Sequence, residues 1–298
     1  MTMITPPPTL AVLYSELVLS LYPILIKTVN TNMYTQILSR FMVFPALALT
    51  FGPFSDFLKT WGTLEGAFSG ILFNIMNLEH VAASYTSYKN LPVGSAISLF
   101  YLYPIFNVIA GALLFGESLS FFSIIVIAIA FVGMYLIATS KNKTKYNIFE
   151  DADRKKHNYG VIMGILAAIT ETLIFVFIRS NTNAQASPYY TVNHLYPAGL
   201  VILILYGFLN KGTVDTNPIS WSKLIGFNAL LGFTGYLSRF YAIPKISTLV
   251  FSLLSFFGVA FGYTWGILFT GDKPTMKAII GGGLIAGAAG LLRYFRNF

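Results

Sequence analysis

The sequence lacks cysteine and is poor in charged residues. Only 10% of its 298 residues are Asp, Glu, Lys or Arg, whereas soluble domains carry about 25%. The absence of cysteine excludes disulfides, thiolate metal ligands and a cysteine nucleophile. The shortage of charge argues against a soluble protein.

Apolar residues are abundant instead. They make up 55% of the chain, aromatic residues make up 16%, and the mean hydropathy is +0.68. These values indicate a multi-pass integral membrane protein, which has the lipid bilayer as a partner. They do not indicate in which cellular membrane the protein resides. The net charge is +8, but no basic face with interleaved aromatics is present, so no nucleic-acid partner is expected.

Motifs for metals, cofactors and catalysis are also missing from the sequence. The three histidines, His80, His157 and His194, are scattered, and no HExxH pair or nucleotide-binding glycine loop occurs. The stretch GESLS lacks the closing glycine of a GxSxG nucleophile elbow. The sequence therefore predicts no metal, no cofactor and no enzymatic activity.

Ten apolar runs have the length of about 17–25 residues that spans a bilayer. They are 9–28, 34–52, 65–88, 92–115, 119–139, 159–180, 189–209, 219–242, 247–269 and 275–295. The longest connector, 140–158, is polar and charged. The prediction is an all-α polytopic membrane protein with ten transmembrane helices, made of a five-helix repeat at 1–139, a polar linker, and a second five-helix repeat at 159–298.

The two halves repeat each other in sequence. The stretch 113–120, LLFGESLS, returns 155 positions later as LFTGDKPT at 268–275, and the same offset pairs Glu16 with Glu171. Because five spans are an odd number, the second half would start on the opposite membrane face from the first. An inverted repeat of this kind is typical of secondary transporters.

The repeated stretch predicts a tight helix–helix turn. Gly116 and Gly271 can take the left-handed conformation that closes a helix. Glu117 and Asp272 would then lie before the next helix, whose N-terminal dipole favours negative charge by about 0.3–1 kcal/mol.

These motifs resemble the EamA-type, ten-helix members of the drug/metabolite transporter superfamily. The resemblance rests on LPVGSA at 91–96, FGESLS at 115–120, YAIPKIS at 241–247 and TGDKPT at 270–275, and it covers nearly the whole chain. It implies two five-helix repeats and transport by alternating access. It leaves the substrate open, because members of the family are described as moving amino acids, nucleobases, nucleotide sugars, sugar phosphates and drugs.

Charged residues inside the apolar runs are the first candidates for a substrate site, since a charge at bilayer depth costs roughly 2.5–3.5 kcal/mol. Glu16 and Glu171 lie half-way along the first and sixth runs. We expect them to face a central cavity and to bind a proton, a cation or a substrate amine; neutral, hydrogen-bonded packing is the alternative. Arg239, in the eighth run, is expected to hold a substrate carboxylate or phosphate or to pair with Glu79, with snorkelling to the interface as its alternative.

Polar residues of the third and fourth runs complete the predicted site. Glu79 and His80 are adjacent in NIMNLEHVAAS, and neighbours in a helix point about 100° apart, so one of the two is expected to face the cavity. Asn77, Tyr85 and Tyr103 are expected to line it as well. For each, a hydrogen bond within the packed helices is the alternative.

Other polar residues in the runs are left undecided by the sequence. Arg40 and His194 lie in the second run of each half and suit either a cavity or packing. A set of tyrosines could line a pocket or form interfacial belts: Tyr22, Tyr85, Tyr88, Tyr101, Tyr103, Tyr196 and Tyr263.

Prolines and glycines inside the runs predict mechanical features. Pro23, Pro45, Pro104 and Pro197 would kink their helices. The spacing GxxxG at 283–287 would let a neighbouring helix approach closely. We expect that neighbour within a monomer, with a dimer contact as the alternative.

The orientation of the chain in the membrane stays open. Loops on the face that holds both termini carry five Lys and Arg residues, and those on the other face carry twelve. The positive-inside rule places the second face in the cytoplasm, whereas the family resemblance implies cytoplasmic termini.

The function predicted from these features is secondary transport of a small polar organic metabolite, such as an amino acid or a similar zwitterion. Coupling of this transport to protons is part of the hypothesis. Phosphorylated metabolites, nucleotide sugars and organic cations are the alternative substrates. A membrane scaffold without transport activity is a further alternative, and it predicts that the polar residues of the runs can all be replaced without loss of flux.

Overall fold

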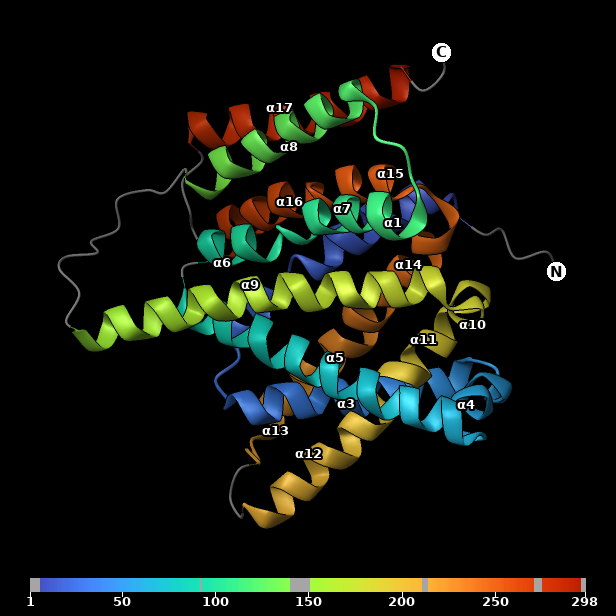
Figure 1. The fold of residues 1–298 in the computed structure, drawn as a ribbon. Coiled ribbons are helices and arrows are strands. Elements are labelled where there is room, and N and C mark those ends of the chain that lie inside the picture. Colours follow the sequence, from blue (N-terminus) through green and yellow to red (C-terminus); the bar gives the residue numbers. More distant parts are fainter. Residues whose placement is uncertain (1–5, 92, 140–150, 211–213, 271–274, 296–298) are drawn as a thin grey trace.

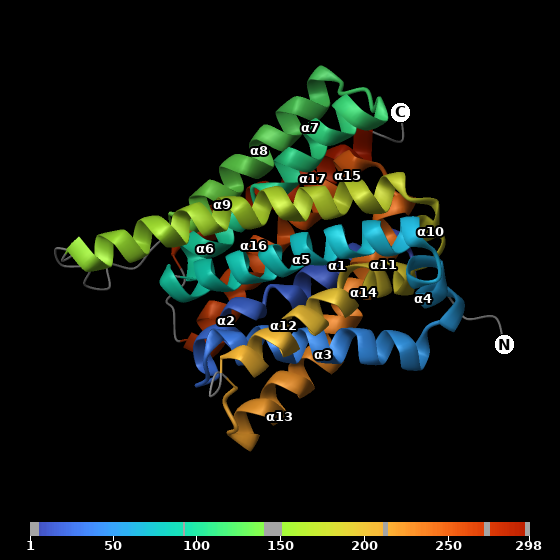
Figure 2. The same cartoon turned by 60° about the horizontal axis from the view of Figure 1, so that its bottom comes forward.

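A computed structural model describes residues 6–91, 93–139, 151–210, 214–270 and 275–295 of the chain. All regular elements within these residues are helices, which lie side by side in one bundle (Figure 1). The same arrangement turned by 60° shows that α5 and α9 run next to each other through its middle (Figure 2).

The helices of the first half begin at Pro8. They are α1 (Pro8–Leu19), α2 (Tyr22–Thr28), α3 (Met33–Phe51), α4 (Phe54–Trp61), α5 (Leu64–Asn90), α6 (Val93–Phe100), α7 (Tyr103–Phe115) and α8 (Phe121–Ala138).

Within the described residues, the second half adds nine α-helices and three short turns of other helix types. The α-helices are α9 (Asp151–Ser180), α10 (Thr182–Ala186), α11 (Pro188–Leu195), α12 (Pro197–Leu209), α13 (Pro218–Phe227), α14 (Phe233–Ala242), α15 (Thr248–Ser255), α16 (Phe257–Trp265) and α17 (Met276–Phe295). The turns are π-helical η1 (Asn228–Gly232), 3₁₀-helical η2 (Ile243–Lys245) and π-helical η3 (Gly266–Thr270).

Helices occupy the described part of each predicted run. By length and composition, five helical stretches can cross a membrane: Pro8–Thr28, Ala96–Phe115, Lys155–Ser180, Pro188–Leu209 and Thr248–Phe269. A sixth is reached if α3 and α4, bent by 120°, count as one span. The fold is therefore an all-helical, multi-pass membrane protein. One boundary differs from the prediction, because α9 already begins at Asp151, inside the expected linker.

Helix breaks fall just before three of the four prolines in the runs. Pro23 follows the break between α1 and α2, Pro104 follows that between α6 and α7, and Pro197 follows that between α11 and α12. Proline has no N–H to continue the ladder and its ring clashes with the preceding turn. Pro45 lies inside an unbroken α3.

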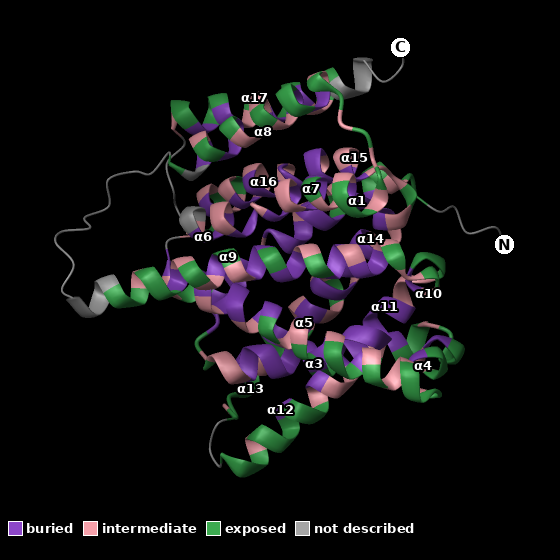
Figure 3. Cartoon of the chain, viewed as in Figure 1, coloured by how far each residue is buried: buried purple, intermediate pink, exposed green. Residues whose placement is uncertain are grey.

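Large apolar side chains lie on the outer surface of the bundle, and several ionisable side chains lie inside its largely apolar interior. Figure 3 shows exposed residues along the outward faces of α8, α12 and α17. Many of these exposed residues are large and apolar, among them Phe121, Ile124, Phe208, Leu209 and Ile279. Charged side chains are buried instead: Glu16, Arg40, His80, Glu171 and Arg239 are each 5% exposed or less. This distribution suits a bundle whose outer surface meets lipid.

The predicted turn of the first half is confirmed. Gly116 ends α7 in the left-handed conformation, with φ of 62°. Ser120 then caps α8 through its hydroxyl. The matching glycine and aspartate of the second half, within 271–274, lie outside the described residues. Thr275, which follows them, caps α17 through its hydroxyl.

The close glycine contact between helices lies at other positions than the predicted ones. α8 and α17 lie side by side (Figure 1), and Gly133 faces Gly281 there. A Cβ on either glycine would be 2.5–2.6 Å from the carbonyl oxygen of the other. A Cβ added to Gly283 or Gly287 would meet no described atom within 4 Å, so these two glycines do not pack inside the monomer.

Candidate functional site

An arginine joins two carboxylates in the middle of the bundle. Arg239 of α14 donates from Nη2 to Glu16 Oε1 of α1 at 2.7 Å, and from Nη1 to Glu171 Oε1 of α9. The three side chains are between 0% and 6% exposed. One guanidinium therefore links a glutamate of the first half to the matching glutamate of the second half.

Two tyrosines complete the hydrogen bonding of Glu16. Tyr101 donates to Oε2 at 2.7 Å, and Tyr103 donates to Oε1 at 3.1 Å. Residues two apart in a continuous helix point roughly 200° apart. Both hydroxyls reach one carboxylate because the chain breaks at Tyr101 and Leu102, between α6 and α7. The helix break before Pro104 thus builds this part of the site.

His80 of α5 lies against the second glutamate. Its Nε2 is 3.2 Å from Glu171 Oε2, but the geometry makes no hydrogen bond, and Oε2 has no donor among the described residues. His80 Nδ1 lies 3.1 Å from the carbonyl of Ala167. If Nδ1 donates to this carbonyl, Nε2 is an acceptor that faces a second acceptor, Glu171 Oε2, until a further proton lies between them; if Nδ1 instead accepts from the Thr170 hydroxyl, 3.0 Å away, Nε2 itself carries the proton.

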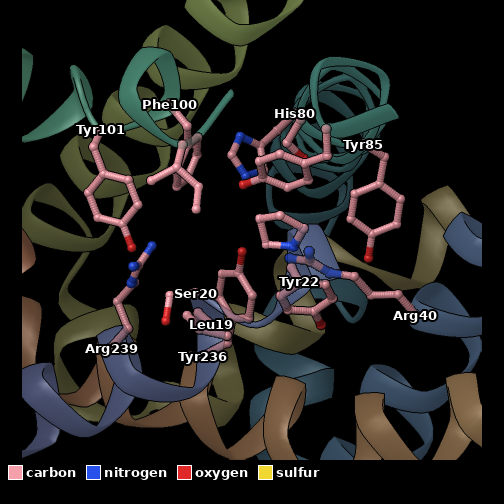
Figure 4. A pocket seen from close by; sticks show the side chains of 14 residues that line it. Leu19, Ser20, Tyr22, Arg40, His80, Tyr85, Phe100, Tyr101, Tyr236 and Arg239 are labelled. Carbon is pink, nitrogen blue, oxygen red and sulfur yellow. The ribbon is translucent and has the colours of Figure 1, made fainter. Parts of the chain in front are cut away.

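A small cavity lies beside this cluster (Figure 4). Its volume is about 20 Å³, which suits about one water molecule. In Figure 4 Tyr101 and Arg239 lie on one side of the cavity, and Tyr85 and Arg40 lie on the other, with His80 between them at the top. Every residue that lines the cavity is buried, and a charged group lies at each end of it.

Most of the predicted site residues meet at this place. The central cluster contains Glu16, His80, Tyr103, Glu171 and Arg239. Tyr85 lines the cavity on the opposite side.

Two predicted residues lie elsewhere, and one pairing changes. Glu79 is exposed on the outer side of α5, so His80 is the neighbour that faces the cavity. Asn77 donates to the carbonyl of Leu195 at 2.9 Å and thereby satisfies the backbone at the break between α11 and α12. Arg239 does not pair with Glu79, because the two buried glutamates occupy its guanidinium.

The sequence left Arg40 of α3 undecided between a cavity and packing, and the structure places it in the wall of the same cavity. It is 1% exposed, and its Nε and Nη2 both donate to the hydroxyl of Tyr196, at 3.2 and 2.8 Å. Its guanidinium lies 4.3 Å from the ring centre of Tyr236. A charge inside an apolar run was the available signal for Arg40, whereas nothing in the sequence separates Tyr236 from the other tyrosines.

Apolar helices around a buried cluster of ion pairs, with a cavity beside it, define a polytopic membrane protein of the transporter class. The EamA-like transporter family matches residues 7–139 and again residues 158–294. The chain belongs to this family. The predicted resemblance, the membrane location and the assignment to transporters rather than enzymes are thereby confirmed.

Individual relatives are more distant. The chain is 25% identical over 198 residues to the uncharacterized transporter YxxF of Bacillus subtilis (strain 168), covering 66% of this chain and 60% of that protein. It is 21% identical over 222 residues to the pseudopaline exporter CntI of Pseudomonas aeruginosa (strain UCBPP-PA14), covering 71% of this chain and 69% of that protein. The match thus spans less than two thirds of the Bacillus transporter.

A solved crystal structure shares the fold. It superposes with a TM-score of 0.73 at 15% identity and covers 95% of both chains. At this identity the likeness concerns the fold alone.

Proposed function

We propose that this protein is a secondary transporter of a small polar organic metabolite, an amino acid or a similar zwitterion. The proposed architecture is ten membrane-spanning segments in two inverted halves, 1–139 and 159–298. The observation that carries the proposal is the ion cluster, in which Arg239 binds one carboxylate from each half. A substrate that competes for these groups would separate the halves, which is what alternating access requires.

The small volume of the buried cavity supports this mechanism. At about 20 Å³ it has no room for an amino acid, so binding requires the helices around it to move apart. The ion cluster and the tyrosines that donate to Glu16 would then rearrange around the substrate. One arrangement would open the site to one membrane face, and the arrangement related by the repeat would open it to the other.

The contact between His80 and Glu171 supports proton coupling. His80 Nε2 and Glu171 Oε2 lie 3.2 Å apart, so a single proton shared between them would hold the two groups together. A substrate ammonium group that binds Glu171 Oε2 would take the place of that proton. Release of the proton and binding of the amine would then be linked at one carboxylate.

Phosphorylated substrates fit the site less well. Within the described residues, the cavity wall carries Arg40 and Arg239, and Arg239 is already neutralised by two glutamates. The Pseudomonas relative is named as an exporter of pseudopaline, which supports export of a small organic molecule as the direction of transport.

The first test is a thermal-stability screen of the purified protein against amino acids, nucleotide sugars, sugar phosphates and organic cations at several pH values. Amino acids should raise the melting temperature, since a ligand at 100 times its Kd adds about 2.7 kcal/mol of stability. Glu171→Gln should abolish that shift and the matching uptake into proteoliposomes. Glu79→Gln, which changes an exposed carboxylate of α5, is the control and should keep both. Stabilisation by sugar phosphates alone would contradict the proposal.

A further inference from the structure

The two buried arginines beside the cavity differ in their partners. Arg239 is bound by two carboxylates. Arg40 has no carboxylate within ion-pair distance among the described residues, and its two hydrogen bonds both end on the hydroxyl of Tyr196. A guanidinium held away from water in this way lacks a counter-charge.

Aromatic rings surround Arg40 without neutralising it. Its guanidinium lies 4.3 Å from the ring centre of Tyr236 and 5.2 Å from those of Tyr22 and Phe44. Such rings hold a cation in place by their electron-rich faces, but they carry no net charge. The position of the guanidinium is therefore fixed, while its charge remains available to an anion in the cavity.

Two tyrosine hydroxyls that line the cavity with Arg40 differ in their hydrogen bonding. The Tyr22 hydroxyl donates at 2.8 Å to Asn228 of the π-helical turn η1, whose amide donates in turn to Ser39. The Tyr85 hydroxyl lines the same cavity as Arg40, in a residue only 1% exposed; it makes no hydrogen bond of regular geometry among the described residues, and it lies within interaction range of the Arg40 guanidinium. Figure 4 shows Tyr85 and Arg40 at the same end of the cavity.

We propose that Arg40, assisted by the Tyr85 hydroxyl, binds the carboxylate of the transported substrate. This inference rests on the proposed transport function and narrows its substrate to molecules that carry a carboxylate. A guanidinium binds a carboxylate through two parallel hydrogen bonds, and Arg40 is the cavity arginine whose charge is free to do so. It takes the role that the sequence suggested for Arg239.

The charges at the other end of the cavity set the orientation of the substrate. With both carboxylates ionised, Glu16, Glu171 and Arg239 sum to one negative charge, whereas Arg40 supplies one positive charge at the opposite end. A zwitterion bound lengthwise would place its carboxylate on Arg40 and its ammonium group near Glu171. Uncharged ligands and simple amines satisfy only part of this pattern.

The experiment compares acids with their neutral analogues on purified protein and in proteoliposomes. The probes are the twenty common amino acids, the amides and decarboxylated amines of the binders among them, and the monocarboxylates lactate and acetate. Wild type should prefer a bound amino acid over its amide at least tenfold. Arg40→Gln should weaken binding of the acid ten- to a hundredfold and leave binding of the amide within twofold.

Two further variants keep the test decisive. Tyr85→Phe removes a single hydroxyl, so it reports on the site even if Arg40→Gln does not fold, and it should lower the preference for acid over amide severalfold. Arg179→Gln removes a guanidinium at the end of the bundle and should leave the preference unchanged.

The possible outcomes separate the two proposals. If amino acids bind and both Arg40→Gln and Tyr85→Phe keep the full preference for acid over amide, the role of Arg40 is overturned while transport of amino acids stands. If the protein binds only ligands without a carboxylate, both the inference and the proposed substrate class are overturned.

Discussion

Among the described residues, ion pairs between glutamate and arginine join the first half of the chain to the second at two places, the centre of the bundle and its end. At the centre, Glu16 and Glu171 share Arg239, and the side chains are 0–6% exposed. At the end, Glu117 lies 2.7 Å from Arg179, and these side chains are 21% and 16% exposed. The chemistry is the same, but the surroundings differ.

Both members of the pair at the end of the bundle make further hydrogen bonds within the protein. Glu117 accepts from the backbone N–H of Thr248 at 3.0 Å and from its hydroxyl at 2.6 Å, at the start of α15. Arg179 donates to the carbonyls of Ile243 and Ile246, at 3.0 and 2.7 Å. The sequence placed Glu117 before α8, whereas its carboxylate serves the N-terminus of α15, where the helix dipole favours negative charge.

The central cluster instead keeps groups that the protein does not fully satisfy. Glu171 Oε2 has no donor, and Arg239 Nε has no acceptor, among the described residues. Unsatisfied buried polar atoms are costly in a purely structural ion pair. The outer pair therefore joins the two halves with all of its named contacts inside the protein, whereas the central cluster retains one carboxylate oxygen and one guanidinium N–H without a described partner, as the proposed transport mechanism requires.

Removal of the central cation should give the largest effect. Arg239→Gln leaves Glu16 and Glu171 buried without a counter-charge, and breaking a buried pair costs about 3–5 kcal/mol. We expect a large fall in the melting temperature and loss of transport. The triple variant that also carries Glu16→Gln and Glu171→Gln should regain most of the stability but no transport. An Arg239→Gln protein as stable as wild type would show that the cluster is not held by charge.

The second-largest effect is expected from a substitution that crowds the central cluster sterically without altering any charge. A Cβ on Gly258 of α16 would collide with the Tyr101 hydroxyl and Glu16 Oε2. Gly258→Ala should therefore break their hydrogen bond, cost about 1–3 kcal/mol as overpacking does, and slow transport. Gly282→Ala, where the new Cβ meets no described atom within 4 Å, is the matched control and should behave as wild type in both assays.

A smaller effect is expected at the outer pair. Glu117→Gln keeps an acceptor for Thr248 but removes the charge that Arg179 and the start of α15 stabilise, at a cost of about 1–2 kcal/mol. The melting temperature should fall modestly, and the substrate Kd should stay within twofold of wild type. A Kd raised tenfold or more would mean that the outer pair also shapes the binding site.

The smallest effect should come from the turn that presents Glu117. Gly116 has φ of 62°, and a Cβ there meets nothing within 4 Å, so Gly116→Ala costs only the left-handed backbone strain of about 1 kcal/mol. Thermal unfolding should show this loss, and Gly116→Asn should recover part of it because asparagine tolerates this conformation better. Equal stability of alanine and glycine would indicate that the turn relaxes.

Much of the candidate site could be predicted because a charge in an apolar run is costly wherever the run ends up. That rule found Glu16, Glu171 and Arg239. The rule failed for Glu79, which is exposed although it lies in an apolar run. Glu79 and His80 point about 100° apart on one helix, and only the packing of neighbouring helices decides which of the two is buried. The rule could not separate Asn77 from a ligand-binding amide, because the backbone break that uses its amide lies more than a hundred positions away, at Leu195.

The sequence by itself determined the membrane environment, the helical class, the family and the internal repeat, because hydrophobic length, composition and motif spacing are local properties of the chain. The tertiary structure alone decided which buried cation is neutralised. Arg239 meets Glu16 across 223 positions and Arg40 meets Tyr196 across 156. Ion pairing depends on separations of a few ångströms, and such separations between distant segments exist only once the helices have packed.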